Sequence, residues 1–148
     1  MKLILIRGLP GAGKSELSRL FDGPTFAADD FYYERGGGVY DFDSRLLPHA
    51  HQQCQERTLK ALNDGKDLAV VVTNTFSQRW ELEPYLKMAE EGSHGVWVID
   101  LFDGGLTNSQ LAARGLHGVP VEGIAAMRSR WEHDWRNGDP VAPWLRGK

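Results

Sequence analysis

The sequence predicts an α/β fold in which a short parallel sheet lies between two layers of helices. Apolar runs typical of strands alternate with segments typical of helices, and this order favours a parallel sheet with crossover helices. The run 68–72 is apolar throughout, as expected of a strand covered on both faces. The chain has 148 residues, 41% hydrophobic and 25% charged, so we expect one globular domain over 1–148.

The first forty residues are expected to hold two short strands and one helix. The apolar run 3–6 predicts a buried strand, and 15–21 predicts the opening turns of a helix. Asp22-Gly23-Pro24 favours a turn, after which 25–28 predicts a second strand. The segment 32–43 contains three consecutive glycines flanked by tyrosines, so we expect a mobile loop or a loose hairpin there.

The remainder of the chain is expected to alternate helices with strands. A long helix is predicted over 48–63, because Leu59 and Leu62 share a face and Asp64-Gly65 is a typical helix end. The elements expected after it are strand 68–72, helix 79–91, strand 95–101, and short helices at 108–114 and 121–135. The tail beyond them contains Pro140 and Pro143 and predicts irregular structure.

A glycine-rich segment between the first strand and the first helix fits G-x-x-x-x-G-K-[ST] at every fixed position. Glycines let backbone N–H groups turn toward phosphate oxygens, and the start of the helix adds partial positive charge. Lys14 is expected to reach the β- and γ-phosphates, and the Ser15 hydroxyl to bind Mg²⁺. We therefore predict a P-loop NTPase fold that binds ATP, or another nucleoside triphosphate, and Mg²⁺ through Gly8, Leu9, Pro10, Gly11, Ala12, Gly13, Lys14 and Ser15.

Polar residues follow the second and third predicted strands, at the edge where ligands bind in such sheets. Asp29 is placed to take the proton of a hydroxyl that attacks the γ-phosphoryl group, although a helix N-cap or a solvated loop would also favour aspartate. Asp30 could instead be structural or orient its neighbour. Asn74 and Thr75 could hydrogen-bond the acceptor or a metal-bound water, or satisfy backbone groups at a strand end.

Five segments in order resemble the P-loop polynucleotide-kinase-type family, which includes the kinase domain of phage polynucleotide 5′-kinase and small kinases related to the NEDD4-binding protein. They are GLPGAGKS, ADDFY, G-x-Y-x-F-D over 38–43, TNTFSQRWELEPY and LAARGLHGVP. The resemblance runs from Met1 to about Trp131 and implies that Asp29 is the base toward a 5′-hydroxyl. It also implies that Arg114 is the lid arginine that contacts ATP phosphates.

The chain departs from this family at three positions. Thr73 stands where the family often has an aspartate, which leaves Mg²⁺ to Ser15, the phosphates and water. Tyr32 replaces an arginine that engages acceptor phosphate in the phage kinase. The second lid arginine is replaced around His117-Gly118. The resemblance therefore says least about how the acceptor is recognised.

Two aromatic groups allow two interpretations each. Tyr32, Tyr33, Tyr40 and Phe42 could stack on a nucleobase or pack as in an ordinary hairpin. In the last predicted helix, tryptophans combine with basic residues, which indicates either a solvated face with core tryptophans or a nucleic-acid rim; these residues are Arg128, Arg130, Arg136, Trp131 and Trp135. His51 and Cys54 lack a second pair of ligands and do not predict a zinc site, although His51 could line the active site.

We expect an ATP-dependent kinase whose leading acceptor is the 5′-hydroxyl of DNA or RNA. A nucleoside, a hydroxymethylated base in DNA and a small metabolite remain alternatives, as does an ATP-hydrolysing switch or adaptor. The net charge of −3 argues against indiscriminate nucleic-acid binding, and the single cysteine fits a reducing compartment. The four-residue apolar run at the start is too short for a signal peptide, and we expect a cytoplasmic protein without membrane contact and of undetermined oligomeric state.

Overall fold

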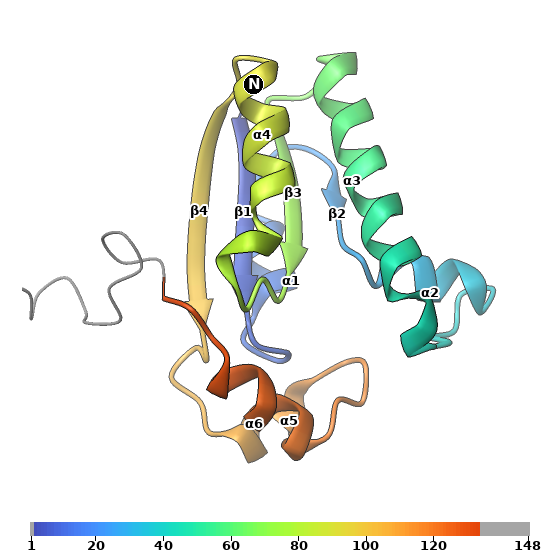
Figure 1. Cartoon of the computed structure of the whole chain (residues 1–148), viewed down its shortest axis with the longest axis vertical. Helices are drawn as coiled ribbons and strands as arrows, with labels where there is room; N and C mark the ends of the chain where they lie inside the picture. The colour runs from blue at the N-terminus through green and yellow to red at the C-terminus, as the bar shows by residue number, and fades with distance from the viewer. Residues whose placement is uncertain (1, 134–148) are drawn as a thin grey trace, which may run out of the picture.

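A computed structural model describes residues 2–133 and contains one four-stranded parallel sheet with the strand order β2-β3-β1-β4 (Figure 1). The strands are β1 (Lys2–Gly8), β2 (Thr25–Phe26), β3 (Ala69–Asn74) and β4 (Gly95–Phe102). The helices are α1 (Lys14–Ser18), α2 (Asp30–Arg35), α3 (Leu47–Asp64), α4 (Glu83–Glu91), α5 (Asn108–Arg114) and α6 (Val121–Ser129). The predicted α/β class and parallel sheet are confirmed.

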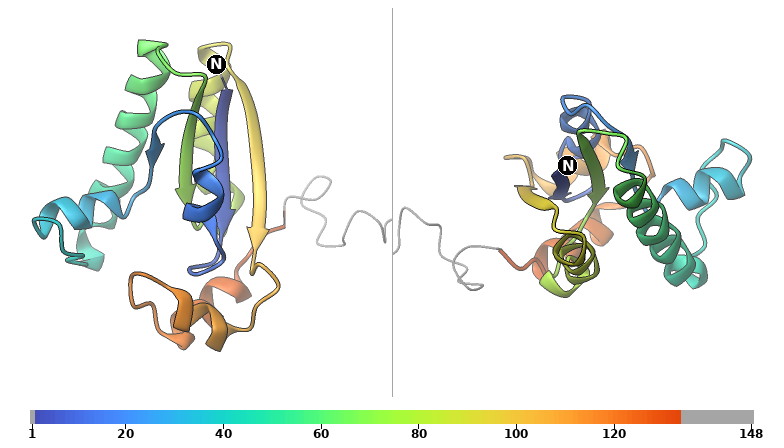
Figure 2. Two further views of the ribbon diagram at one scale, coloured as in Figure 1. Left: turned by 180° about the vertical axis from the view of Figure 1, so that it is seen from behind. Right: turned by 90° about the horizontal axis from the view of Figure 1, so that it is seen from above.

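The sheet is covered on both faces. Leu3 and Leu5 of β1 pack with residues of α3 and α4, whereas Ile4 and Ile6 face the opposite way and pack with Leu17 of α1. Figure 2 shows α1 on the face opposite to α3 and α4. Because helices lie over both faces, β1 and β3 are buried almost throughout, as the uninterrupted apolar run of β3 predicts.

The carboxyl ends of the strands meet at one edge of the sheet, and α5 and α6 lie beyond that edge (Figure 1). A small apolar cluster attaches both helices to the loop between β1 and α1; its buried members are Leu9, Leu111, Ile124 and Trp131. The glycine-rich segment Gly8 to Ser15, called the phosphate loop below, is therefore held between the sheet and these two helices.

The expectation of a loop or hairpin over 32–43 is wrong for its first part. Residues Asp30–Arg35 form α2, which ends at Gly36. The glycine triplet marks the end of a helix, and the residues before it are free of glycine and proline and continue the helical hydrogen bonding that starts at Asp29. The turn that follows is tied back to α2, since Asp41 N donates to Tyr32 O at 3.2 Å.

Two predicted helices are shorter than expected. The predicted helix 79–91 is divided at Leu82 into a 3-10 turn (Arg79–Glu81) and α4, which has a proline in its first turn. The last helix ends at Ser129 instead of continuing toward 135. A long-range contact explains this end. Glu132 N donates to Ser77 O at 2.7 Å, so it cannot donate to the carbonyl oxygen four residues earlier, as it would if α6 continued.

A buried arginine joins three segments beside the phosphate loop. Arg7 of β1 is fully buried and donates to the carbonyl oxygens of Phe76 (2.7 Å), Ser77 (3.4 Å) and Glu132 (2.7 Å). Its guanidinium also lies 3.4 Å from an Asp100 carboxylate oxygen. Arg7 thus fastens the turn after β3 and the segment after α6 to the centre of the sheet.

We expect Arg7→Ala to lower the free energy of unfolding by about 3 kcal/mol, because several buried acceptors lose a charged donor together. The measurement is urea unfolding followed by circular dichroism. Arg19→Ala is the matched control, since Arg19 is 74% exposed and its pairing with Glu16 is of the kind worth under about 1 kcal/mol. Equal unfolding midpoints for the two variants would contradict the structural role of Arg7.

Candidate active site

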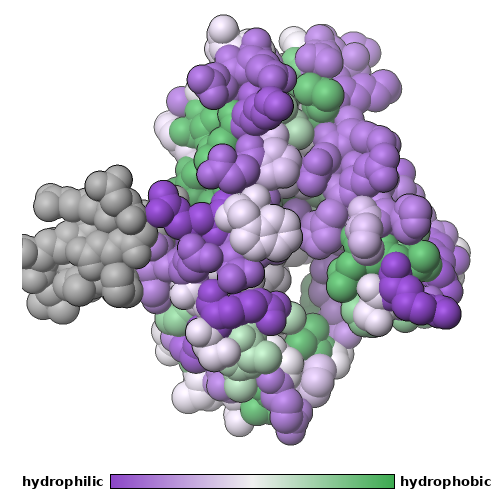
Figure 3. Space-filling model, viewed as in Figure 1, coloured by the Kyte–Doolittle hydropathy of each residue, from purple (hydrophilic) through white to green (hydrophobic). Residues whose placement is uncertain are grey.

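A cleft of about 760 Å³ opens at the carboxyl edge of the sheet. In Figure 3 the surface is hollowed between the part formed by α5 and α6 and the part formed by α2 and α3. The cleft brings together predicted residues from distant segments, and its lining includes Pro10, Gly11, Gly13, Lys14, Ser15, Asp29, Asp30, Tyr32, Asn74, Thr75 and Arg114. Of the other motif residues, Leu9 is buried in the cluster beneath the loop.

The phosphate loop closes around its own lysine. Lys14 Nζ donates to the carbonyl oxygens of Gly8 at 2.7 Å and Leu9 at 3.2 Å. Burial lowers the pKa of Lys14 to about 8, while the nearby charge of Asp29 acts in the opposite direction. Gly11 has a φ of +85°, and a side chain there would clash with the Leu111 carbonyl oxygen. The loop therefore has the shape and the positive charge that phosphate binding needs.

Asp29 lies at the N-terminus of α2 but makes no side-chain capping hydrogen bond. Its Oδ1 accepts a hydrogen bond from the Tyr40 hydroxyl at 2.7 Å, and its Oδ2 lies 3.2 Å from His117 Nε2. Burial and this bond to Asp29 raise the pKa of Tyr40, so its hydroxyl remains a donor. The Asp29 carboxylate is 41% exposed and faces the cleft that holds Lys14. It is available to a ligand.

His117 lies on the segment between α5 and α6, and residues of this segment line the cleft together with residues of α2. Its Nδ1 is 3.2 Å from the Tyr33 hydroxyl, and its ring centre is 4.5 Å from that of Tyr40. The two ring nitrogens therefore have different partners, Tyr33 at Nδ1 and Asp29 at Nε2. Sequence reasoning missed His117; its one signal was its place near the missing lid arginine.

Two predicted acceptor residues hold the turn that carries Asp29. Asp30 Oδ2 accepts from Ala27 N at 3.0 Å, and burial raises the pKa of Asp30. Asn74 Oδ1 accepts from Ala28 N at 2.8 Å. These bonds favour the structural alternative for Asp30 and Asn74. Thr75 contributes its backbone carbonyl to Gly8 N at 3.2 Å, which ties the end of β3 to the phosphate loop.

Tyr32 is buried, with 1% of its surface exposed, and packs against Phe31, Tyr40 and Phe42. Its hydroxyl donates to the Asp43 carbonyl oxygen at 2.9 Å. The packing alternative therefore describes Tyr32 best. Phe42, which is 54% exposed and also lines the cleft, has the open aromatic surface.

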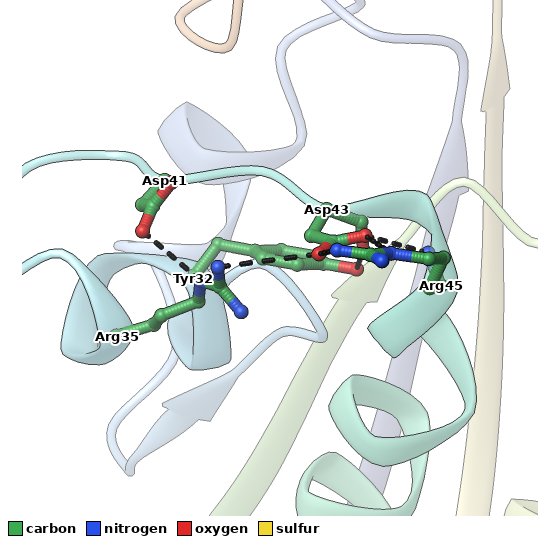
Figure 4. Close-up of polar contacts among 5 residues, drawn as sticks. All are labelled: Tyr32, Arg35, Asp41, Asp43 and Arg45. Atoms are coloured by element: carbon green, nitrogen blue, oxygen red, sulfur yellow. Dashed lines mark hydrogen bonds and ion pairs between the residues drawn. The ribbon is translucent and has the colours of Figure 1, made fainter.

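Charged pairs fix the turn that carries these aromatic side chains (Figure 4). Arg35 Nε donates to Asp41 at 3.0 Å, and Arg45 donates to both carboxylate oxygens of Asp43. The Arg45 hydrogen bonds hold the pKa of Asp43 at about 2. These ion pairs thus hold in place the turn whose aromatic side chains line the cleft.

The basic residues of the last helix have different surroundings. Arg128 donates to Asp103 at 2.7 Å, to Asn108 and to the Leu106 carbonyl, so it joins α6 to the segment before α5. Trp131 is buried in the cluster beneath the phosphate loop. Arg130 lines the cleft. The remaining members of this predicted group, Trp135 and Arg136, lie outside the described residues.

Within residues 2–133, no three or more His, Cys, Asp or Glu side chains are grouped so as to hold a metal ion. His51 lines the cleft, whereas Cys54 is buried and lies 3.8 Å from Asn74 Nδ2. Ser15 lines the cleft beside Lys14, where an Mg²⁺ ion that keeps several waters and phosphate ligands fits. The described helices also include none long and apolar enough to cross a membrane.

A family model described as an AAA domain matches residues 3–133. Human NEDD4-binding protein 2 is 34% identical over 143 residues, which cover 88% of this chain. The chain spans only 8% of the length of that protein.

Solved structures share the fold at low sequence identity. A protein from Chloroflexus aurantiacus matches with a TM-score of 0.61 at 18% identity, over 88% of this chain and 76% of its own. A chain of the Pnkp1/Rnl/Hen1 complex matches with a TM-score of 0.57 at 19% identity, over 76% and 38%. A gluconokinase from Sinorhizobium meliloti matches with a TM-score of 0.51 at 20% identity, over 89% and 75%. The fold is that of P-loop kinases.

Proposed function

We propose that this chain, which belongs to the P-loop kinase-like AAA domain family, transfers the γ-phosphoryl group of ATP to a hydroxyl. The leading acceptor in this proposal is a polynucleotide 5′-end. The observation that carries the proposal is the place of Asp29. Its carboxylate is spared from helix capping and lies in the same cleft as Lys14 and Ser15. Phosphoryl transfer to a hydroxyl requires a carboxylate beside the phosphate loop to take the hydroxyl proton, whereas nucleotide binding alone does not require one.

In the proposed reaction, the acceptor oxygen attacks the γ-phosphorus while Asp29 takes the hydroxyl proton. The bond between the γ-phosphorus and the bridging oxygen breaks, and ADP leaves with the electron pair. Tyr40 and His117 hold the two oxygens of Asp29 and so orient it toward the acceptor. Ser15 would hold Mg²⁺, which neutralises phosphate charge when bound. Lys14 and Arg114 meet the charge on the transferred group.

One observation supports a polynucleotide as the acceptor. Exposed or half-buried rings of Tyr33, Tyr40 and Phe42 line the cleft near Asp29, where a base could stack. The solved structures do not distinguish between acceptors, because a chain of the Pnkp1/Rnl/Hen1 complex and a gluconokinase share the fold, and a small metabolite is therefore the alternative acceptor. An ATP-hydrolysing switch is the alternative of another class.

The experiment is incubation of the purified protein with γ-labelled ATP and a panel of acceptors. The panel holds single-stranded DNA and RNA with 5′-hydroxyl ends, the same strands with 5′-phosphates, nucleosides and gluconate. We expect label only in strands with a free 5′-hydroxyl. Label in nucleosides or gluconate alone would favour the small-molecule alternative, and release of phosphate without any labelled acceptor would favour the switch.

Arg114 at the end of α5 gives a separate prediction. Its Nε donates to the Gly11 carbonyl oxygen at 3.2 Å, so the guanidinium lies over the phosphate loop. We expect Arg114→Ala to lower kcat by about 10²-fold or more with little change in the Kd of ATP. The reason is that Arg114 stabilises negative charge that develops on the phosphoryl group only in the transition state. Single-turnover kinetics and ATP titration measure the two quantities. A loss confined to ATP affinity would assign Arg114 to the bound nucleotide instead.

A further inference from the structure

Arg130 is a cation in the cleft that the proposed reaction leaves without a role. It lies at the C-terminus of α6, and its side chain lines the same cleft as Asp29. Its Nε donates to Ser77 Oγ at 3.2 Å. Among residues 2–133 no carboxylate lies within ion-pair distance of its guanidinium, unlike neighbouring Arg128, which pairs with Asp103. Its two terminal NH₂ groups thus remain available for a bidentate anion contact.

A hydrogen-bonded chain orients this guanidinium. The Ser77 hydroxyl donates to Glu81 Oε2 at 3.0 Å and so presents its lone pair to Arg130 Nε. The same carboxylate oxygen of Glu81 accepts from Gln78 N at 2.9 Å. The negative charge of Glu81 is therefore engaged by two donors, and Ser77 separates it from Arg130.

The backbone around Arg130 is also held in place. Glu132 N donates to Ser77 O, and buried Arg7 bonds the carbonyl oxygens of both Ser77 and Glu132. Beside Arg130, the indole of Trp131 packs on the Arg7 guanidinium, with 4.4 Å between the guanidinium carbon and the ring centre. A cleft arginine anchored to a buried cluster keeps a defined position, which suits recognition better than a freely moving surface charge.

The position of Ser77 indicates which ligand Arg130 meets. Ser77 follows β3, which lies between β1, the strand of the phosphate loop, and β2, the strand that leads to Asp29. Arg130, bonded to Ser77, therefore lies after the strand that separates the strand of the phosphate loop from the strand that leads to Asp29. We infer that Arg130 and Ser77 form an anion subsite for a phosphate of the acceptor itself, next to the nucleoside whose hydroxyl Asp29 activates. This inference rests on the proposed function and names the feature of the acceptor that the site recognises.

Binding to a nucleoside and to its 3′-monophosphate, each in the presence of Mg·ADP, tests the subsite by calorimetry. We expect the wild-type protein to bind the 3′-monophosphate about tenfold more tightly, and Arg130→Ala to lose that difference while keeping its affinity for the nucleoside and for ATP. Arg130→Lys should recover part of it, because the charge remains without the planar fork. Lys87→Ala, which removes a charge from the exposed surface of α4, should change nothing.

Oligonucleotide binding supplies a second readout, since the slope of log Kd against log salt should fall by about one in Arg130→Ala. If oligonucleotides are phosphorylated and Arg130→Ala matches Lys87→Ala in every assay, the subsite is overturned and the proposed function stands. If no nucleic acid is phosphorylated but binding of the 3′-monophosphate depends on Arg130, the subsite stands and the proposed acceptor fails. Weaker ATP binding in Arg130→Ala would assign Arg130 to nucleotide binding and overturn the inference.

Discussion

Asp29→Asn is expected to lower the rate of phosphoryl transfer by about 10²–10⁴-fold while leaving the Kd of ATP nearly unchanged. The amide has the same shape but cannot take the hydroxyl proton. Its amide oxygen can still accept from either Tyr40 or His117, so the fold of α2 and one of these two contacts should remain. Single-turnover transfer to a 5′-hydroxyl oligonucleotide, with ATP affinity measured separately, distinguishes loss of chemistry from loss of binding.

Asp30→Asn is the matched control, because Asp30 differs from Asp29 by one position and uses its carboxylate on Ala27 N. We expect transfer within about tenfold of wild type and little loss of stability, since the amide oxygen can still accept from Ala27 N and the reaction does not use this side chain. The reverse result, with Asp30 essential and Asp29 dispensable, would show that the neighbouring carboxylate is the base. Wild-type transfer rates in both Asp29→Asn and Asp30→Asn would remove proton abstraction by this pair from the mechanism.

Lys14→Ala is expected to abolish phosphoryl transfer and weaken ATP binding without unfolding the protein. The lysine provides charge to the phosphate site and fills no apolar core position, and its burial already disfavours the ammonium form. Labelled transfer, ATP titration and thermal unfolding measure the three effects. Lys60→Ala, whose side chain is 81% exposed on α3, removes the same charge as a control. Wild-type turnover in Lys14→Ala would exclude the phosphate loop from the reaction.

The lowered pKa of Lys14 adds a pH dependence to this prediction. With a pKa of about 8, the side chain is charged below that pH and increasingly neutral above it. Phosphates favour the charged form, so bound ATP raises this pKa and binding takes up a proton. We expect ATP affinity to fall as the pH rises through 8, beyond any change from ATP itself. Calorimetry in buffers of different ionisation enthalpy measures the proton uptake, which Lys14→Ala should lack.

The phosphate loop and the place of Asp29 could be predicted from the sequence because each depends on short-range order. Gly8 to Ser15 form one contiguous segment between a strand and a helix, and that context predicts what the segment binds. Asp29 follows a strand, and parallel strands bring their carboxyl ends to one edge. The continuous apolar run of β3 likewise predicted a strand covered on both faces.

Contacts between distant segments decided the rest. The sequence contains no periodicity that places His117 on Asp29, 88 positions earlier, or that distinguishes Arg130 in the cleft from Arg128 on Asp103. Tyr32 looked equally suited to stacking and to packing, and it is buried because α2 and the turn after it enclose it. Arg7 resembles a surface charge in a strand until Phe76, Ser77 and Glu132 surround it with carbonyl oxygens. The chemistry of the phosphate loop is local and so determined by sequence, whereas the acceptor side is built from side chains that meet only when the chain folds.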